Sequence, residues 1–233
     1  MAQQWLWNEF RQIGTDYASV DEVASYDRRM RDFRDIDAEN RQLLEQLALK
    51  HPASLLEIGI GTGAFARVAA AAGHRVLGVD ISPVMLKYSA AMAERAGFTD
   101  MISHTEAGFL SFPETPDGFD GAVSSLALHH LPDLWKHFAV RKIFGALKPG
   151  ARFLLQDVVF DPRSAAPEEY FPSLLPAAGS SRGNFERHIA CEYSTLDWIM
   201  RGLLESNGFQ LINHSVTHGF LHLYTALKPE AAR

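Results

Sequence analysis

The sequence contains one cysteine, Cys191, in 233 residues, so no disulfide bond can form within a single chain. It also lacks a basic excess, because 28 acidic residues outnumber 22 Lys and Arg residues and give a net charge of -6. Proteins that hold long nucleic acids usually carry a strong basic excess, so this charge argues against nucleic-acid binding. No apolar run is long enough to cross a bilayer, and the first ten residues do not resemble a secretory signal. These absences predict a soluble, cytoplasmic protein without a membrane partner.

Strand-like and helix-like segments alternate between residues 54 and 159. Short apolar runs predict strands, and longer amphipathic or alanine-rich segments predict the helices between them. This alternation predicts an α/β fold with a Rossmann-like, mostly parallel sheet and helices on both faces. The expected strands are 54–59, 75–79, 101–106, 152–159 and one within 119–128, and the expected helices are 64–72, 83–96 and 134–147.

The segments on either side of this core have a different pattern. Leucines at near-helical spacing predict a helical N-terminal segment, whereas prolines, Gly, Ser and Asn in 160–187 predict an irregular insertion. Residues 194–207 predict a helix capped by Ser194 or Thr195, and 209–217 and 220–227 predict an antiparallel hairpin. We therefore expect a single domain over 1–233, divided into an N-terminal lid (1–50), a cofactor-binding core (51–159), an insertion over the acceptor site (160–193) and a C-terminal helix with the hairpin (194–233).

A glycine-rich loop follows the first predicted strand, in the run LLEIGIGTGAF at residues 55–65. Gly59, Gly61 and Gly63 allow tight turns and bring bare backbone close to a ligand, and the next helix offers free N–H groups at its start. Asp80 ends the following strand, where a carboxylate accepts hydrogen bonds from ribose hydroxyls. The combination predicts a site for an adenosine-containing cofactor.

Two cofactor classes fit this loop. Gly59, Gly61 and Ala64 satisfy the looser dinucleotide pattern, which would indicate an NAD(P)-dependent oxidoreductase. Glu57 before the glycines and the third glycine at Gly63 favour S-adenosylmethionine instead. The chain also ends in a helix and a hairpin, without a second nucleotide-binding half.

With these motifs, the sequence resembles the class I S-adenosylmethionine-dependent methyltransferases, especially their small-molecule branch. The resemblance implies a seven-stranded sheet with an antiparallel C-terminal hairpin, and transfer of methyl to a small-molecule acceptor with release of S-adenosylhomocysteine. A non-catalytic protein that only binds S-adenosylmethionine is the remaining alternative. By their places in the family's motifs, the expected cofactor-binding residues are Glu57, Gly59, Gly61, Gly63, Asp80, Ile81, Glu106, Ala107, Ser124 and Leu126. Glu106 stands where the family often has aspartate.

Two consecutive histidines, His129 and His130, follow the fourth predicted strand, at the rim where the family places the methyl acceptor. Some phosphobase methyltransferases pair a histidine of this motif with an N-terminal tyrosine, so the resemblance implies His130 and Tyr17 as the catalytic pair. A histidine suits proton removal near neutral pH. The alternative, which the sequence favours slightly, is that His130 packs against the following helix and caps it.

The remaining candidates have simpler interpretations. The N-terminal aromatic residues, Trp5 and Trp7 among them, are expected to pack as a helical cap on the core. His188, Cys191 and Glu192, and a second set of His214, His218 and His222, match no common zinc spacing. We therefore expect no metal site.

Overall fold

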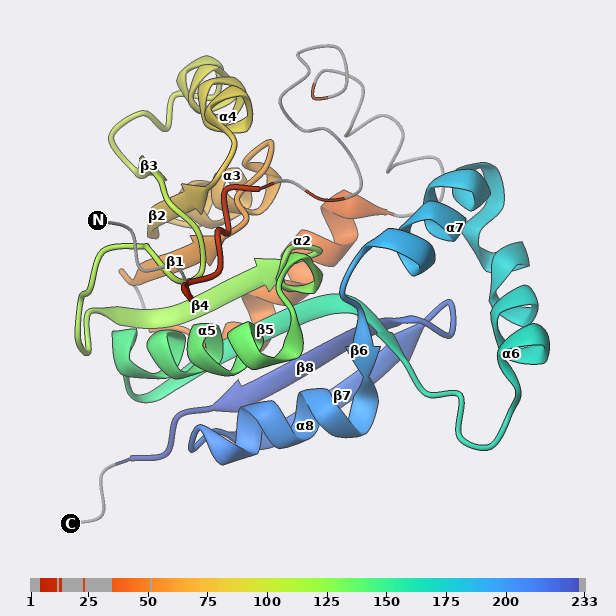
Figure 1. The fold of residues 1–233 in the computed structure, drawn as a ribbon. Helices are drawn as coiled ribbons and strands as arrows, with labels where there is room; N and C mark the ends of the chain where they lie inside the picture. Colours follow the sequence, from red (N-terminus) through yellow and green to blue (C-terminus); the bar gives the residue numbers. More distant parts are fainter. Residues whose placement is uncertain (1–4, 12, 14–22, 24–34, 51, 231–233) are drawn as a thin grey trace.

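The computed structural model describes residues 5–11, 13, 23, 35–50 and 52–230, and their fold is an open α/β sheet between layers of helices (Figure 1). The strands follow the order β3-β2-β1-β4-β5-β8-β7, with a short strand β6 beside β5. No helix in the described residues is both long and apolar enough to span a membrane.

Five parallel strands form one side of the sheet, and an antiparallel hairpin extends it past β5. The hairpin loop is formed by residues 218–220 between the paired Thr217 and Leu221, and His218 and Gly219 in this loop both have positive φ. This mostly parallel sheet with its C-terminal hairpin confirms the predicted fold class. The strands are β1 (Ser54–Ile58), β2 (Arg75–Asp80), β3 (Ile102–Glu106), β4 (Phe119–Ser125), β5 (Leu147–Phe160), β6 (Thr195–Leu196), β7 (Gln210–Thr217) and β8 (Leu221–Leu227).

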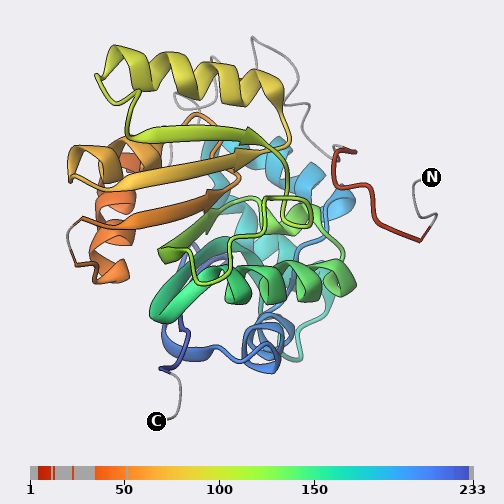
Figure 2. The same ribbon diagram turned by 90° about the vertical axis from the view of Figure 1, so that its left-hand side faces the viewer.

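Helices cover both faces of the sheet (Figures 1 and 2). On one face lie α2 (Ile36–Leu47) and α3 (Ala64–Ala71), with α4 (Pro83–Arg95) beside β2 and β3; on the other lie α5 (Asp133–Ala146) and α8 (Asp197–Ser206). Ser82 caps α4 as predicted, since its Oγ accepts a hydrogen bond from Met85 N at 3.2 Å.

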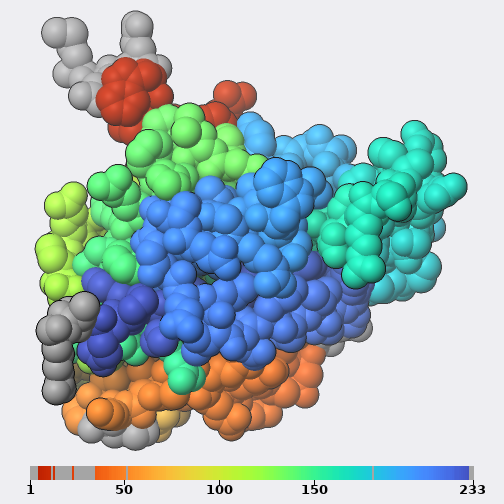
Figure 3. Space-filling view, turned by 90° about the horizontal axis from the view of Figure 1, so that it is seen from below, coloured from red at the N-terminus to blue at the C-terminus, as the bar shows by residue number. Residues whose placement is uncertain are grey.

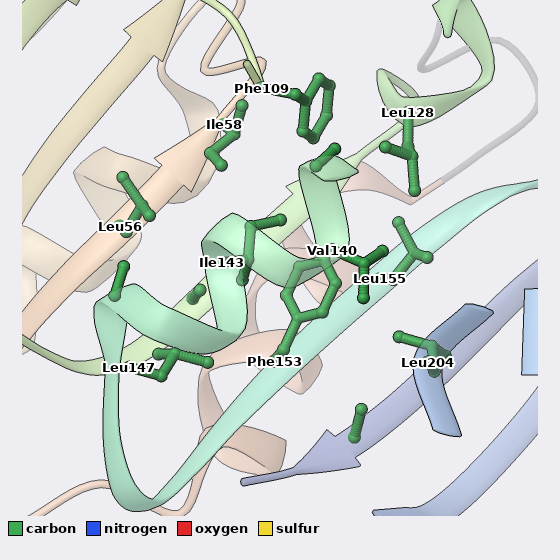
Figure 4. Close-up of a cluster of buried hydrophobic side chains, with 14 of the residues drawn as sticks. Leu56, Ile58, Phe109, Leu128, Val140, Ile143, Leu147, Phe153, Leu155 and Leu204 are labelled. Atoms are coloured by element: carbon green, nitrogen blue, oxygen red, sulfur yellow. The ribbon is translucent and has the colours of Figure 1, made fainter. Parts of the chain in front are cut away.

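The core between α5 and the sheet explains why the sequences of the central strands are almost continuously apolar. Leu56 and Ile58 of β1 face Val140 and Ile143 of α5, and Phe153 of β5 closes the same cluster (Figure 4). Each of these side chains is almost completely buried. A central parallel strand is covered on both faces, so its sequence shows no polar alternation.

The insertion after β5 is helical, which corrects the expectation of irregular structure. It consists of α6 (Pro167–Leu174), the 3-10 segment η2 (Leu175–Ser181) and α7 (Arg182–Cys191). Its proline at position 167 occupies the first helical turn, where the missing N–H costs no hydrogen bond. Leu174 and Phe185 bury their side chains against Phe160, and this packing stabilises helices that the composition alone did not indicate.

The start of α8 also differs from the expectation. The helix begins at Asp197, after Leu196, and no side chain caps its first turn. Thr195 belongs instead to β6, where its backbone pairs with Val159 and its hydroxyl donates to Asp133 Oδ2 at 2.9 Å. Thr195 therefore pairs with the end of β5 and does not cap α8, although the local sequence pattern predicted that it would.

The described N-terminal residues 5–11 lie against α5, as the red atoms beside the green ones show in Figure 3. The Trp5 ring stacks on Trp135 with 6.4 Å between centroids, and Trp7 meets Tyr193 edge-on at 5.7 Å. Trp5 is nevertheless 67% exposed. Between residue 11 and residue 35, the expected helical N-terminal lid falls largely outside the described residues.

Candidate cofactor site and active centre

The glycine loop between β1 and α3 forms the floor of a pocket at the carboxyl ends of the parallel strands. Gly59, Gly61 and Gly63 all have positive φ, a conformation that favours glycine. A Cβ at Gly59 would lie 2.4 Å from Ala127 Cβ, whereas a Cβ at Gly61 would point into open space. The loop thus packs closely against Ala127 at Gly59 and leaves open space at Gly61, where a ligand can approach the backbone.

Asp80 organises this loop from the end of β2. Its Oδ2 accepts a hydrogen bond from Gly61 N and its Oδ1 accepts one from Ser82 N, both at 2.9 Å. Burial raises the pKa of the Asp80 carboxyl, while the two backbone donors act in the opposite direction. The carboxylate lines the pocket and keeps further acceptor capacity for ribose hydroxyls.

Glu57 brings a second carboxyl group into the same pocket. It is buried, and this burial raises its pKa well above the usual range. Its Oε2 is also buried and has no hydrogen-bond partner among the described residues. A buried acceptor without a partner is costly, so a ligand that brings donors to this position fits the site. The hydroxyl and ammonium groups of S-adenosylmethionine are such donors.

The pocket collects most, but not all, of the residues expected from the sequence. Gly63 lies at the start of α3, where a Cβ would collide with Ser89 Oγ at 2.1 Å, so its glycine serves helix packing. Glu106 is exposed at the end of β3, and Ser124 is fully buried within β4. The expected residues that do line the pocket are Glu57, Gly59, Gly61, Asp80, Ile81, Ala107, Leu126 and His130.

Other lining residues were not expected. Ile36 and Asn40 come from α2, Glu9 comes from the N-terminal segment, and Phe109 and Ser125 follow β3 and end β4. Phe109 and Ser125 lie next to motifs that the sequence analysis recognised, so their proximity to these motifs could have predicted them as pocket residues. The α2 and N-terminal residues carry no local motif, because only the folded chain brings them to the pocket.

His130 stands at the β4 end of the pocket, in the short 3-10 turn η1 (Leu128–His130). Its Nδ1 lies 3.1 Å from Ala127 O; a carbonyl only accepts, so this nitrogen carries the proton and donates. Burial lowers the pKa of His130 to about 4, and the charge of His129 acts in the same direction. The ring is therefore neutral near pH 7, and Nε2 is its basic atom. Tyr17, its expected partner, lies outside the described residues.

His129 turns away from the pocket and joins a buried charge network. Its Nδ1 makes a short hydrogen bond with Asp157 Oδ1, its backbone N donates to Asp157 Oδ2 at 2.9 Å, and its Nε2 lies 3.2 Å from Glu192 Oε2. Burial alone would lower the pKa of His129, but the two carboxylates outweigh it and raise the value to about 9. His188 Nδ1 lies 2.5 Å from Glu192 Oε2 on the other side. The network links η1, β5 and the insertion.

Two groups of potential metal ligands exist in the described part of the chain. One is His129, His130 and Glu192, and the other is Asp197, His214 and His222 at the C-terminal hairpin. In the second group Arg201 Nη2 lies 2.6 Å from His214 Nδ1. An arginine only donates, so His214 Nε2 carries the proton in this arrangement and does not present a lone pair to a metal.

Known methyltransferases are similar to this chain in sequence. A family model described as a methyltransferase domain matches residues 56–155. An uncharacterized methyltransferase of Bacillus cereus is 31% identical over 190 residues, which cover 79% of this chain and 84% of the relative.

Solved structures show the same fold at low sequence identity. Geranyl diphosphate C-methyltransferase from Streptomyces coelicolor, in complex with Mg²⁺, geranyl diphosphate and S-adenosyl-L-homocysteine, has a TM-score of 0.67 at 15% identity, covering 82% of this chain and 77% of that chain. A putative methyltransferase of Haloferax volcanii, in complex with a methyltransferase activator, has a TM-score of 0.69 at 18% identity, covering 91% and 97%.

Fold, glycine cradle and carboxylates together define a class I S-adenosylmethionine-dependent enzyme. The chain belongs to this methyltransferase family, and S-adenosylmethionine is its cofactor.

Proposed function

We propose that this enzyme transfers the methyl group to a small-molecule acceptor and releases S-adenosylhomocysteine. The observation that supports this most directly is one continuous pocket that is lined both by the glycine cradle and by His130 and Leu131. A ligand in the cradle and an acceptor beside His130 would share this pocket. The net charge of -6 does not favour a nucleic-acid acceptor, because proteins that hold long nucleic acids usually carry a basic excess.

S-adenosylmethionine supplies an electrophilic methyl group on a sulfonium when it is bound. Glu57, Asp80 and the backbone around Gly61 would hold it, since these groups present acceptors and bare backbone to the pocket. Fixing the cofactor and the acceptor in line is itself a large part of catalysis, because orientation contributes up to roughly 7–11 kcal/mol.

We further propose that His130 orients the acceptor and accepts its proton. Its Nδ1–H is fixed on Ala127 O, so Nε2 is the acceptor atom, and its low pKa keeps the ring neutral. A neutral ring with a low pKa is a weak base. It therefore suits an acceptor whose proton becomes acidic as the new bond forms, or one that needs only a hydrogen bond.

The insertion and the N-terminal segment would frame the acceptor. The insertion contacts η1 through Glu192 and His129, and the N-terminal segment contacts α5 through Trp5 and Trp135. Both elements stand at the strand ends where ligands of open α/β sheets bind. In this proposal the whole chain works as one domain, with a lid, a cofactor-binding core, an insertion and a C-terminal hairpin.

The test is an acceptor screen that follows labelled methyl from S-adenosylmethionine into small molecules, with S-adenosylhomocysteine measured in parallel. We expect one class of small acceptor to be labelled, with one S-adenosylhomocysteine released per methyl transferred. Labelling of RNA or protein in a matched screen, with no small molecule labelled, would contradict the proposal.

A further inference from the structure

The N-terminal segment places a carboxylate inside the cofactor pocket. Glu9 is 8% exposed and lines the pocket together with residues that follow β2 and β3. Its Oε2 accepts a hydrogen bond from Leu110 N at 2.8 Å, across 101 positions of sequence. Figure 2 shows this red segment on the side where the parallel strands end. The contact holds the carboxylate at one end of the pocket.

Gly108 provides the room for this carboxylate. A Cβ at Gly108 would lie 2.4 Å from Glu9 Oε2 and 2.5 Å from Glu9 Cδ. The φ of Gly108 is not in the left-handed region, so its own backbone does not require glycine. The absence of a side chain at Gly108 therefore leaves the space that the Glu9 carboxylate occupies.

The order of the strands shows which part of the cofactor meets Glu9. The pocket runs along the sheet from the residues after β3, through Asp80 on β2 and the loop after β1, to His130 after β4. Asp80 suits the ribose, and the methyl group must lie toward His130 and the insertion. The nucleobase is left at the β3 end, where Ala107 and Phe109 line the pocket next to Glu9.

Few polar side chains at the β3 end of the pocket could form a hydrogen bond with a nucleobase. Glu106, the acid that the sequence suggests, is exposed and does not line the pocket. An ionised carboxylate is only an acceptor, and adenine presents its exocyclic amino group as a donor. We propose that Glu9 reads the nucleobase, by accepting a hydrogen bond from the adenine amino group. This assignment rests on S-adenosylmethionine as the cofactor in the proposed function.

A base without this amino group should bind poorly. Hypoxanthine carries a carbonyl oxygen there, so an acceptor would face the Glu9 carboxylate. Sites built to pair with a substrate donor reject analogues that lack it, and a bond to a charged group corresponds to roughly 10- to 100-fold in affinity. We therefore expect the enzyme to prefer S-adenosylhomocysteine over S-inosylhomocysteine by at least about tenfold.

The experiment is isothermal titration of the full-length protein with these two ligands, so it needs no turnover. Glu9→Gln keeps the size of the side chain and an oxygen for Leu110 N, and its amide can donate to the hypoxanthine carbonyl. We expect this variant to reduce the preference for adenine about tenfold. Glu114→Gln, an exposed acid on the loop after β3, is the matched control and should keep the wild-type preference.

A second variant tests the same contact from the other side, in case Glu9→Gln does not fold. Gly108→Ala should displace the Glu9 carboxylate and reduce the same preference, with folding checked by circular dichroism. Equal affinity of the wild-type protein for both ligands overturns the proposal without any variant. A preference that is kept by Glu9→Gln but lost in Glu106→Gln also overturns it, by assigning the base to the acid after β3. Failure of the wild-type protein to bind S-adenosylhomocysteine at all would instead refute the proposed function.

Discussion

At the scale of single residues, Asp80 is the group whose loss should affect the cofactor most directly. Asp80→Ala removes the acceptor of both Gly61 N and Ser82 N and the expected ribose contacts. Hydrogen bonds of about 0.5–1.5 kcal/mol each predict a loss of roughly tenfold or more in affinity. Titration with S-adenosylhomocysteine measures this loss. Asp100→Ala, an exposed acid before β3, serves as the control, and equal affinity in both variants would contradict the role of Asp80.

His130→Asn tests the acceptor end of the pocket. Asparagine keeps hydrogen bonding but cannot take a proton near neutral pH, so turnover should fall about 10²–10⁴-fold if His130 is the base. Cofactor affinity should stay nearly unchanged. The pKa of about 4 means that His130 stays neutral from pH 6 to 8, so its titration should not alter turnover across this range. Near-normal turnover of the folded variant would leave His130 with a packing role.

The buried His129 makes a separate prediction about stability and pH. Its pKa is raised to about 9 in the folded protein, above the unfolded value near 6.5. Its contribution to stability is therefore complete below pH 6.5 and is lost as the pH rises through about 9. Urea unfolding between pH 6 and 10 should show that the free energy of unfolding decreases as the pH rises. In Asp157→Asn this decrease should be smaller, because His129 loses its main partner.

A useful control for this pH series is His218→Gln, which changes an exposed histidine at the tip of the β7–β8 hairpin. It should follow the wild-type dependence. A wild-type free energy of unfolding that is flat from pH 7 to 10 would show that the charged form of His129 is not stabilised.

At the scale of elements, the N-terminal segment should matter more for binding than for folding. Removing residues 1–11 deletes the Trp5–Trp135 and Trp7–Tyr193 contacts and the Glu9 carboxylate, but none of the strands. We expect a small drop in melting temperature and a clear loss of cofactor affinity and turnover. Thermal unfolding and titration on the same preparation separate the two effects. Full affinity after truncation would exclude the segment from the site.

The elements also show what the sequence could and could not predict. Strands β1 and β2 and the loop between them are recognisable because a buried run, its glycines and Asp80 lie within 26 residues of one another, from residue 55 to 80. The helices of the insertion were missed, since their stability comes from burying Phe185 against Phe160. Glu9 in the pocket and the contact between Glu192 and His129 depend on distant segments meeting, and no local pattern encodes such meetings.

At the scale of the whole molecule, we predict activity without a metal ion. One histidine of each candidate ligand group is already engaged with a neighbouring side chain, since Arg201 lies on His214 and Asp157 on His129. Exhaustive chelation followed by a turnover assay should leave the rate unchanged. Loss of activity that added divalent metal restores would contradict this expectation. His214→Ala and His129→Gln would then show which group binds the ion.

The charge network around His129 limits how the insertion can be exchanged between related enzymes. Its members come from three places: Asp157 from β5, His129 from η1, and His188 with Glu192 from the insertion. A chimera that received only a foreign insertion would leave an imidazolium and a carboxylate buried with half of their partners. An uncompensated buried charge of this kind costs about 3–5 kcal/mol, enough to unfold many domains. Laboratory grafting of new acceptor loops should therefore move all four residues as one unit.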